Sequence, residues 1–288
     1  MRRPTVDIVV PFVGDDADRR ALIARMGELA LGDGDTLTIV DNGIHPPPAD
    51  PVVLHAPDRP TSYHARNRGA ARGSAEWILF LDDDVIAPAD LLDRVFAEPL
   101  GDRSGVIAGG VRDEQPDDPA TLTLAARYAA LRAPMSQEKT LGNPRWAYAQ
   151  TANAAFRRTA FEQVGGFDES ARSGGDADIC FRLRDAGWEL AYRPDAMDVH
   201  RNRTTLKGLV RQRTRHGAGS AWLNRRHPGS LPAGPVRRLL REKVVELARH
   251  VRHRRAEEAR MALMDITVHG AYLAGRLRSN EPSTRRRA

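Results

Sequence analysis

Trp77-Ile78-Leu79-Phe80-Leu81-Asp82-Asp83-Asp84 is the stretch that decides the fold, because five apolar residues run directly into three acids. A continuous apolar run of this length is typical of a central parallel strand that is buried on both faces. Unpaired carboxylates are costly to bury, so the acids need a cation or hydrogen-bond donors nearby. The natural cation is a hard divalent ion with oxygen ligands. The simpler alternative for a lone acidic triplet is a solvated turn before the helix that Pro88 opens.

Short apolar runs alternate with amphipathic segments on both sides of this strand. We expect strands at residues 6–11, 36–41, 52–55, 77–81, 149–156, 189–193 and 198–200. We expect helices at residues 18–31, at 62–72 with Ser62 as the N-cap, from 88 onward, and at 121–132 and 176–186. This alternation predicts an α/β fold, with a mostly parallel, Rossmann-like sheet flanked by helices. Ligands of such sheets bind at the carboxyl ends of the strands, where the three acids lie.

Charge is divided unevenly along this chain of 288 residues, whose formal net charge is +6. Residues 1–200 hold 22 Lys and Arg against 32 Asp and Glu, a net charge of −10. Residues 201–288 hold 22 against 6, a net charge of +16. An acidic body with a basic C-terminal region argues against a uniformly basic nucleic-acid-binding protein, so we expect no nucleic-acid partner.

Cysteine content and hydropathy limit the cellular compartments in which we expect this protein. The single cysteine, Cys180, excludes an internal disulfide and a cysteine-based zinc site. No apolar run approaches the roughly 20 residues that a membrane-spanning helix needs. Met1-Arg2-Arg3 leads into the first strand without an apolar signal core. We therefore expect a cytoplasmic protein, either soluble or peripheral at the inner face of the membrane.

The C-terminal region is predicted to be helical. Residues 204–226 read as a basic helix, 227–235 as a Pro/Gly-rich linker, 236–255 and 256–278 as two more helices, and 279–288 as a disordered tail. Leu240, Val244, Leu247 and Val251 form an apolar stripe on the first of these two helices. Such a helix can lie on an anionic membrane surface. We favour packing within a helical subdomain or in a homodimer interface.

The acidic strand end resembles the Asp-x-Asp motif of GT-A glycosyltransferases, in particular the inverting family 2. Further segments resemble this family in the same order: residues 6–13, 39–43, 65–71, 153–156, 164–169 and 175–183. The resemblance covers about residues 5–225. It implies a GT-A catalytic domain at residues 1–226, a basic helical extension at 227–278 and the tail at 279–288.

The resemblance implies a role for each matching residue. Pro11, Phe12, Asp41, Arg66, Asp82 and Asp83 would bind a nucleotide sugar, with Asp41 at the nucleobase and Arg66 supporting the nucleotide. Asp84 would ligate Mn²⁺ or Mg²⁺, and His200 would complete that metal site. The ordinary alternative for His200 is a strand-end histidine that only forms hydrogen bonds. The family often follows this histidine with a basic helix near the diphosphate, so Arg211 or Arg215 would contact the donor, although a solvated face is the ordinary reading of these arginines.

Asp176 matches the general base of the family. The family usually has Glu-Asp at this point, whereas this chain has Gly175-Asp176. On a helix, Asp178 lies about 200° around from Asp176 and can pair with Arg182 at i+4, so we expect Asp178 to be structural. The alternative role for Asp176 is a helix N-cap, a position that aspartate favours.

These residues predict a metal-dependent inverting glycosyltransferase that moves a sugar from a nucleotide sugar to an acceptor hydroxyl by direct displacement. UDP is favoured because Asp41 suits a pyrimidine edge, with dTDP and GDP left open. One alternative is a nucleotidyltransferase, which would need a Gly-rich basic loop where residues 12–17 are acidic. The other is a non-catalytic module that binds a nucleotide or a partner.

Overall fold

The computed structural model describes residues 3–115, 122–132 and 135–282. Its strands form one sheet in the order β3-β2-β1-β4-β7-β6-β8-β5. The strands are β1 (Val6–Phe12), β2 (Thr36–Asp41), β3 (Val53–His55), β4 (Trp77–Leu81), β5 (Val85–Ile86), β6 (Ser104–Asp113), β7 (Asn153–Arg157) and β8 (Glu189–His200). Strands β3, β2, β1 and β4 are parallel, β7 is antiparallel to β4 and β6, and β5 is antiparallel to β8. The expected mostly parallel sheet is confirmed, and β8 is one long strand where two were expected.

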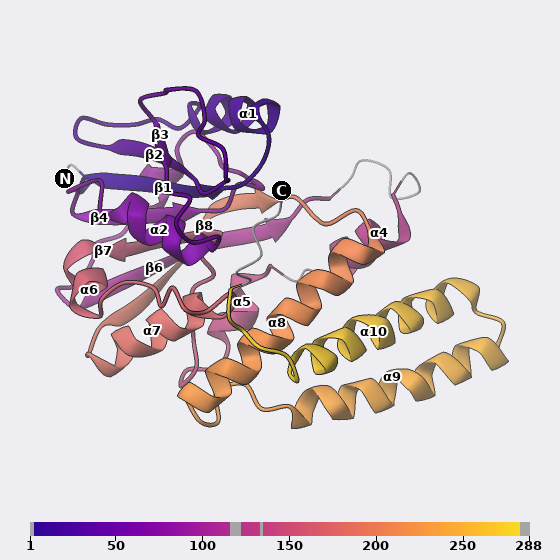
Figure 1. Cartoon of the computed structure of the whole chain (residues 1–288). Coiled ribbons are helices and arrows are strands. Elements are labelled where there is room, and N and C mark those ends of the chain that lie inside the picture. The colour runs from indigo at the N-terminus through magenta and orange to yellow at the C-terminus, as the bar shows by residue number, and fades with distance from the viewer. Residues whose placement is uncertain (1–2, 116–121, 133–134, 283–288) are drawn as a thin grey trace.

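Helices cover both faces of this sheet (Figure 1). They are α1 (Asp16–Met26), α2 (Ser62–Ala70), α3 (Leu91–Val95), α4 (Leu124–Arg132), α5 (Gln137–Leu141), α6 (Arg158–Gln163), α7 (Gly175–Asp185), α8 (Leu206–Arg226), α9 (Gly234–Arg252) and α10 (Ala256–Gly275). One hydrophobic core lies beneath α1 and α3, and a second lies beneath α2, α6 and α7. Residue 121, the first of the helix expected at 121–132, lies outside the described residues, as do residues 116–120 and 133–134.

Strand β4 contributes side chains to both cores in turn. Trp77, Leu79 and Leu81 pack into the first core, and Ile78 and Phe80 pack into the second. All five are fully buried. Because successive side chains of a strand point to opposite faces, a strand that is covered on both sides must be apolar at every position. This explains the continuous apolar run that precedes the acids.

The carboxyl ends of the parallel strands meet at one edge of the sheet. Asp41 ends β2 and pairs in register with Phe12 at the end of β1, while Asp82 directly follows β4. On the far side of β7, Asp113 of β6 pairs in register with His200 of β8. The acids that are far apart in sequence therefore come together at this edge.

Helix α2 packs closely on the sheet because of Gly69. A Cβ atom at this position would lie 2.3 Å from a methyl carbon of Val9 and 2.9 Å from one of Val40. The N-cap of α2 is Thr61, whose Oγ1 accepts a hydrogen bond from the amide of His64 at 3.0 Å. The expected Ser62 cap is therefore wrong by one residue, because Ser62 already belongs to the helix.

The C-terminal helices extend away from the sheet (Figure 1), and α10 packs against both α8 and α9. Two glycines allow the backbones of α8 and α10 to touch. A Cβ at Gly217 would lie 2.0 Å from the carbonyl oxygen of Tyr272, and one at Gly275 would lie 2.0 Å from that of Thr214. Beyond α10, Asn280 is buried and its amide donates to the Ser173 carbonyl at 2.9 Å. Residues 283–288 of the expected tail lie outside the described residues.

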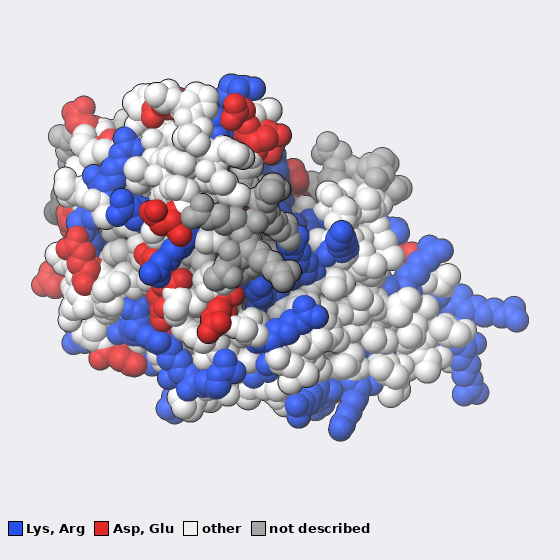
Figure 2. Space-filling view, in the orientation of Figure 1, with Lys and Arg blue, Asp and Glu red and all other residues white. Residues whose placement is uncertain are grey.

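Helix α9 is the most exposed of these elements, since none of its residues is buried. Basic side chains project from this end of the molecule (Figure 2), while acidic side chains gather on the body. This matches the uneven charge along the sequence. Among the described residues, no helix is both long enough and apolar enough to cross a membrane.

Candidate active site

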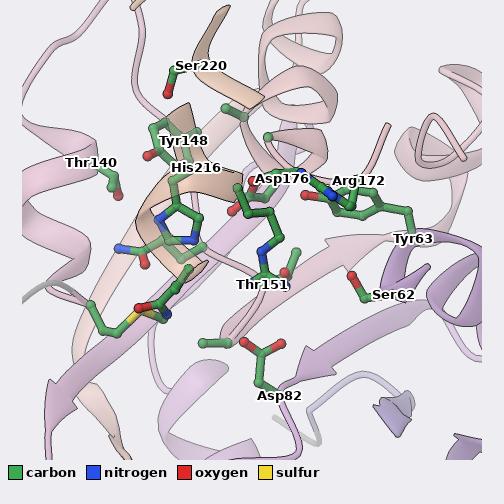
Figure 3. A pocket seen from close by; sticks show the side chains of 18 of the residues that line it. Ser62, Tyr63, Asp82, Thr140, Tyr148, Thr151, Arg172, Asp176, His216 and Ser220 are labelled. Atoms are coloured by element: carbon green, nitrogen blue, oxygen red, sulfur yellow. The ribbon is translucent and has the colours of Figure 1, made fainter. Parts of the chain in front are cut away.

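A polar cavity of about 360 Å³ lies at the carboxyl edge of the sheet (Figure 3). Its lining includes five of the residues that the sequence singled out: Arg66, Asp82, Asp84, Asp176 and His200. Asp82 lies at one side of the view and Asp176 at the other. Pro11, Phe12, Asp41 and Asp83 are not part of the lining among the described residues. The structure thus brings together the predicted metal ligands and the predicted base.

Asp82 is held by an ion pair with Arg66. The guanidinium of Arg66 is 4% exposed and its Nε has no hydrogen-bond partner among the described residues. It also lies over the ring of Tyr63, 5.9 Å from the ring centroid. The arginine of the motif in α2 therefore faces the acid that follows β4, inside the cavity.

Asp84 and His200 form the second charged group of the cavity. The Nε2 atom of His200 lies 3.4 Å from Asp84 Oδ1, and Nδ1 lies 3.7 Å from Oδ1 of the buried Asp113. Burial opposes the charged imidazolium, but the carboxylates of Asp113 and Asp84 outweigh it and raise the pKa of His200 to about 10. The guanidinium of Arg203 also reaches Asp84, at 3.3 Å.

Further carboxyl groups lie near Asp84 and His200, and their negative charges repel one another. Burial, followed by the charges of Asp84 and Asp82, raises the pKa of Asp83 to about 7. Asp198, on the same face of β8 as His200, is fully buried, and neither of its carboxylate oxygens has a hydrogen-bond partner among the described residues. Burial, and next the charge of Asp82, raises the pKa of Asp198 well above its usual value. A lone aspartate inside a strand carries no motif, so no site role could be predicted for Asp198 from the sequence.

The side chains that could ligate a metal in this cavity suit a divalent cation. Asp84 and His200 offer a carboxylate oxygen and an imidazole nitrogen, ligands that Mn²⁺ accepts and that fit Mg²⁺ in part. A cation here would relieve the repulsion among the crowded acids and meet buried oxygens that lack a partner. No cluster of three or more His, Cys, Asp or Glu poised for a metal occurs among the described residues. Asp84 and His200 are therefore the residues that would hold a divalent cation in this cavity.

Pro11, Phe12 and Asp41 are buried outside the lining of the cavity. Asp41 pairs with Arg19 at 3.1 Å and accepts a hydrogen bond from the amide of Gly43 at 2.8 Å. The backbone carbonyl of Asp83 accepts from Arg25 at 2.6 Å. The donor-binding roles of these residues stay predictions.

Asp176 stands in the first turn of α7 and lines the cavity. The helix is capped by Gly174 in the left-handed region (φ +88°), so Asp176 is not the N-cap. Burial raises the pKa of its carboxyl group, against the opposing charge of Arg66. A raised pKa makes the carboxylate a stronger base than an exposed aspartate.

The structure explains why glycine replaces the glutamate that is usual before this aspartate. The amide of Gly175 donates a hydrogen bond to the hydroxyl of Tyr63 at 2.7 Å. A Cβ at position 175 would lie 2.7 Å from the ring of Tyr63. Tyr63 therefore takes the space that a side chain at position 175 would need, and its hydroxyl supplies a contact there.

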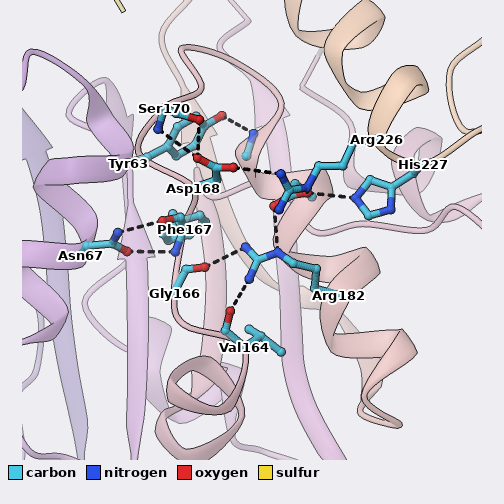
Figure 4. A network of polar contacts seen from close by, with 12 residues as sticks. Tyr63, Asn67, Val164, Gly166, Phe167, Asp168, Ser170, Arg182, Arg226 and His227 are labelled. Carbon is cyan, nitrogen blue, oxygen red and sulfur yellow. Dashed lines mark hydrogen bonds and ion pairs between the residues drawn. The ribbon is translucent and has the colours of Figure 1, made fainter. Parts of the chain in front are cut away.

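Asp178 is a structural residue, as its helical position predicted. It is fully buried and pairs with Arg182 at 2.8 Å, with Arg226 at 2.8 Å and with His227 at 2.9 Å (Figure 4). Arg182 in turn donates to the Gly166 carbonyl at 2.7 Å. These contacts tie α7 to the end of α8 and to the Gly165-Gly166 turn.

Asn67, in the motif of α2, forms hydrogen bonds with the segment that follows the Gly165-Gly166 turn. Its amide oxygen accepts from the Phe167 amide at 2.9 Å, and its nitrogen donates to the Phe167 carbonyl at 2.9 Å (Figure 4). The nitrogen also donates to Glu169 at 2.9 Å. Asn67 and Asp178, which lie in motifs about 100 residues apart in sequence, therefore both hold the segment that leads to Asp176.

Several lining residues were not assigned a site role from the sequence. They come from segments without a motif: Tyr63, Tyr148, Thr151, Arg172, Arg213, His216 and Tyr272. Tyr272 belongs to α10 and Leu231 to the predicted linker. The proposed domain boundary at residue 226 therefore cuts through the wall of the cavity. Only tertiary packing brings these side chains to the site, so no local pattern could have found them.

This arrangement of a sheet, an aspartate-rich strand end and a polar cavity is the GT-A fold. The chain belongs to the family described as glycosyltransferase like family 2, whose model matches residues 32–219.

Curated relatives agree with this assignment. The chain is 29% identical over 234 residues to the pre-mycofactocin glycosyltransferase of Mycobacterium tuberculosis, covering 77% of this chain and 48% of that protein. It is 28% identical over 167 residues to glycosyltransferase AglE of Haloferax volcanii, covering 58% of this chain and 53% of that protein. The chain thus spans about half the length of the curated relatives that it matches.

Solved structures confirm the fold. Mannosyltransferase PcManGT from Pyrobaculum calidifontis, in complex with GDP-Man and Mn²⁺, superposes with a TM-score of 0.55 at 17% identity, covering 95% of this chain and 75% of that one. GalNAc-T7 with UDP, GalNAc and Mn²⁺ superposes with a TM-score of 0.51 at 12% identity, covering 69% of this chain and 44% of that one.

Replacement of Asp178 by Ala should destabilise the protein strongly. The change leaves the part-buried Arg182 and His227 without their buried carboxylate partner, and each lost hydrogen bond to a charged group typically costs about 1.5–3 kcal/mol. Urea denaturation would measure the free energy of unfolding. Asp176→Asn is the matched control, because it removes a half-buried carboxylate whose raised pKa already disfavours its charge in the folded state. It should not lower stability at neutral pH. Equal losses in the two variants would contradict the structural role of Asp178.

Proposed function

We propose that this protein is a metal-dependent inverting glycosyltransferase that transfers a sugar from a nucleotide-diphosphate sugar to an acceptor hydroxyl. The observation that carries the proposal is the presence of Asp84, His200 and Asp176 around one cavity. The first two are suited to a divalent cation at the leaving group, and the third is suited to accept a proton. The family membership and the Mn²⁺ complexes of the structural neighbours support the same assignment.

The proposed reaction is a single displacement. The acceptor oxygen attacks the anomeric carbon while the Asp176 carboxylate takes its proton, and the bond from that carbon to the diphosphate oxygen breaks with inversion. Arg66 and Arg203 face the leaving-group side, where they pair with Asp82 and Asp84. A divalent ion held by Asp84 and His200 would neutralise charge on the departing diphosphate as a Lewis acid. The displacement itself needs no covalent nucleophile from the protein.

The donor is proposed to be a UDP-sugar, with Asp41 at the nucleobase. One neighbour was solved with GDP-Man and another with UDP, so GDP is the main competitor. The nucleotidyltransferase alternative differs in its products, since it would release pyrophosphate from a nucleoside triphosphate.

Asp176→Asn should lower kcat by about 10²–10⁴-fold, because it removes the positioned proton acceptor. Affinity for the nucleotide and Mn²⁺ should be retained, since Asp176 lies across the cavity from Asp82. Asp185→Asn is the matched control on the same helix, where the side chain is exposed. Steady-state kinetics with the preferred donor would measure both variants, and a fully active Asp176→Asn enzyme would refute the assignment of the base.

The acid limb of the kcat–pH profile should lie above the ordinary aspartate range of about 4. Asp176 must be ionised to accept a proton, and burial raises its pKa. Activity should therefore rise with pH through this raised pKa and fall as the carboxyl group protonates. A profile measured from pH 4 to 9 would test this. A limb at the ordinary value, or one that persists unchanged in Asp176→Asn, would contradict it.

A thermal-shift screen of nucleotide sugars, with and without Mn²⁺, tests the donor and the metal together. A ligand at 100 times its Kd adds about 2.7 kcal/mol of stability, so a bound donor raises Tm. We expect the UDP-sugars to give the largest shift, only with the metal, and Asp84→Ala to abolish it. Glu76→Gln, far from the cavity and partly exposed, is the control. Shifts that are independent of the metal, or shifts by triphosphates with pyrophosphate release, would overturn the proposal.

A further inference from the structure

The cavity carries more positive charge than its proposed donor needs. Among the described residues that line it are five arginines and three aspartates, a net charge of +2 before His200 is counted. A donor diphosphate and a divalent cation together add no net charge. The excess therefore remains when the donor and metal are bound, and it points to a second anion.

The excess positive charge of the cavity is carried by Arg172, Arg213 and Arg215. None of the three forms an ion pair with a carboxylate of the described residues, whereas Arg66 pairs with Asp82 and Arg203 with Asp84. The Nε atoms of Arg172 and Arg213 are buried without any hydrogen-bond partner among those residues. Arg172 and Arg213 are half-buried and Arg215 is exposed in the cavity wall. Buried N–H donors normally find acceptors, so the two Nε atoms are available to a group that the polypeptide does not supply.

The arginines also repel one another. Burial, and next the charges of Arg215 and Arg278, lowers the pKa of Arg172. Burial, followed by the charges of Arg215 and Arg213, lowers the pKa of His216 to about 3, so this histidine is neutral. His216 also lines the cavity and can offer a hydrogen bond without adding charge. An anion would relieve the repulsion.

Arg172 lies toward the side of the cavity that holds the proposed base, and Arg215, whose charge acts on Arg172, lines the same cavity. Burial raises the pKa of Tyr63, and the positive charge of Arg215 opposes that rise. The hydroxyl of Tyr63 accepts a hydrogen bond from the amide of Gly175, next to Asp176. Figure 3 shows Arg172 beside the same group, with Asp82 on the opposite side. The backbone of Arg172 is held by the Asn280 carbonyl, to which its amide donates at 2.8 Å. The position beside the base is where an acceptor must enter.

We propose that Arg172 and Arg215 form an anion-binding subsite for the acceptor, which carries a carboxylate or phosphate group close to the hydroxyl that receives the sugar. The inference rests on the proposed function, since it assumes that Asp176 marks the acceptor side. Guanidinium groups bind both anions through paired, charge-assisted hydrogen bonds. The subsite selects acceptors by charge and turns the hydroxyl toward Asp176.

Inorganic phosphate is the probe for this subsite. Calorimetric titration of the full chain would be done first in EDTA and then with saturating UDP and Mn²⁺. Phosphate should bind in both conditions. Arg172→Gln and Arg215→Gln should each weaken phosphate binding by about 10–100-fold, since each removes a charged hydrogen-bond donor. Both variants should keep the affinity of the wild type for UDP with Mn²⁺.

Arg211→Gln is the matched control. The resemblance offered Arg211 as a donor contact, but the structure leaves it exposed on the same helix and outside the cavity lining among the described residues. Its phosphate affinity should equal that of the wild type. Displacement of phosphate by UDP and Mn²⁺ would overturn the proposal and assign the arginines to the donor diphosphate. Absent phosphate binding, or equal binding by wild type and both variants, would overturn it as well.

The same titrations separate the two proposals. Nucleotide binding without phosphate binding removes the subsite and leaves the proposed function intact. If neither UDP nor GDP binds with Mn²⁺, the proposed function fails and the acceptor assignment fails with it. A turnover assay then tests the chemistry directly: with anionic and neutral acceptors that differ in one carboxylate, the wild type should prefer the anionic one, and Arg172→Gln should lose that preference.

Discussion

The burial of β4 between two cores is the constraint on which the rest of the structure depends. Its five apolar side chains can be buried only if helices cover both faces of the sheet. Asp82, Asp83 and Asp84 follow the carboxyl end of this strand and therefore lie at one edge of the sheet. Carboxylates crowded at the end of a buried strand repel one another and lose hydration. The pKa of Asp83 rises to about 7 for this reason. The fold thus concentrates negative charge where a cation and a phosphate-bearing ligand can use it.

A second layer of contacts keeps the proposed base opposite these acids. Asn67 holds the backbone at Phe167, and Asp178 holds Arg182, Arg226 and His227. Neither residue lines the cavity among the described residues. Both belong to segments that resemble the family motifs, so part of each motif encodes the loop that positions Asp176. The glycine at position 175 fits this scheme, since Tyr63 fills the adjoining space and binds the backbone there.

The C-terminal helices complete the cavity and account for part of the basic charge of residues 201–288. Helix α8 brings Arg213, Arg215 and His216 to the wall, and α10 brings Tyr272. Close contact of the two helices at Gly217 and Gly275 sets their positions. The positive charge is therefore divided between an inner group, which faces the cavity, and an outer group on the exposed α9.

The sequence by itself determined the α/β class, the strand that ends in acids, the approximate helix limits and the candidates Asp84, Asp176, His200 and Arg66. The fold class and the strand that ends in acids follow from local periodicity, whereas the four candidate residues follow from the resemblance to the family motifs. Tertiary structure alone decided that Asp41 and Phe12 lie outside the cavity and that Arg172, Arg215 and Tyr272 line it. It also decided that the buried carboxylate of Asp198 has no hydrogen-bond partner in the part of the chain that the structure describes. Burial and the partners of a charged group depend on residues distant in sequence, so no local pattern could predict them.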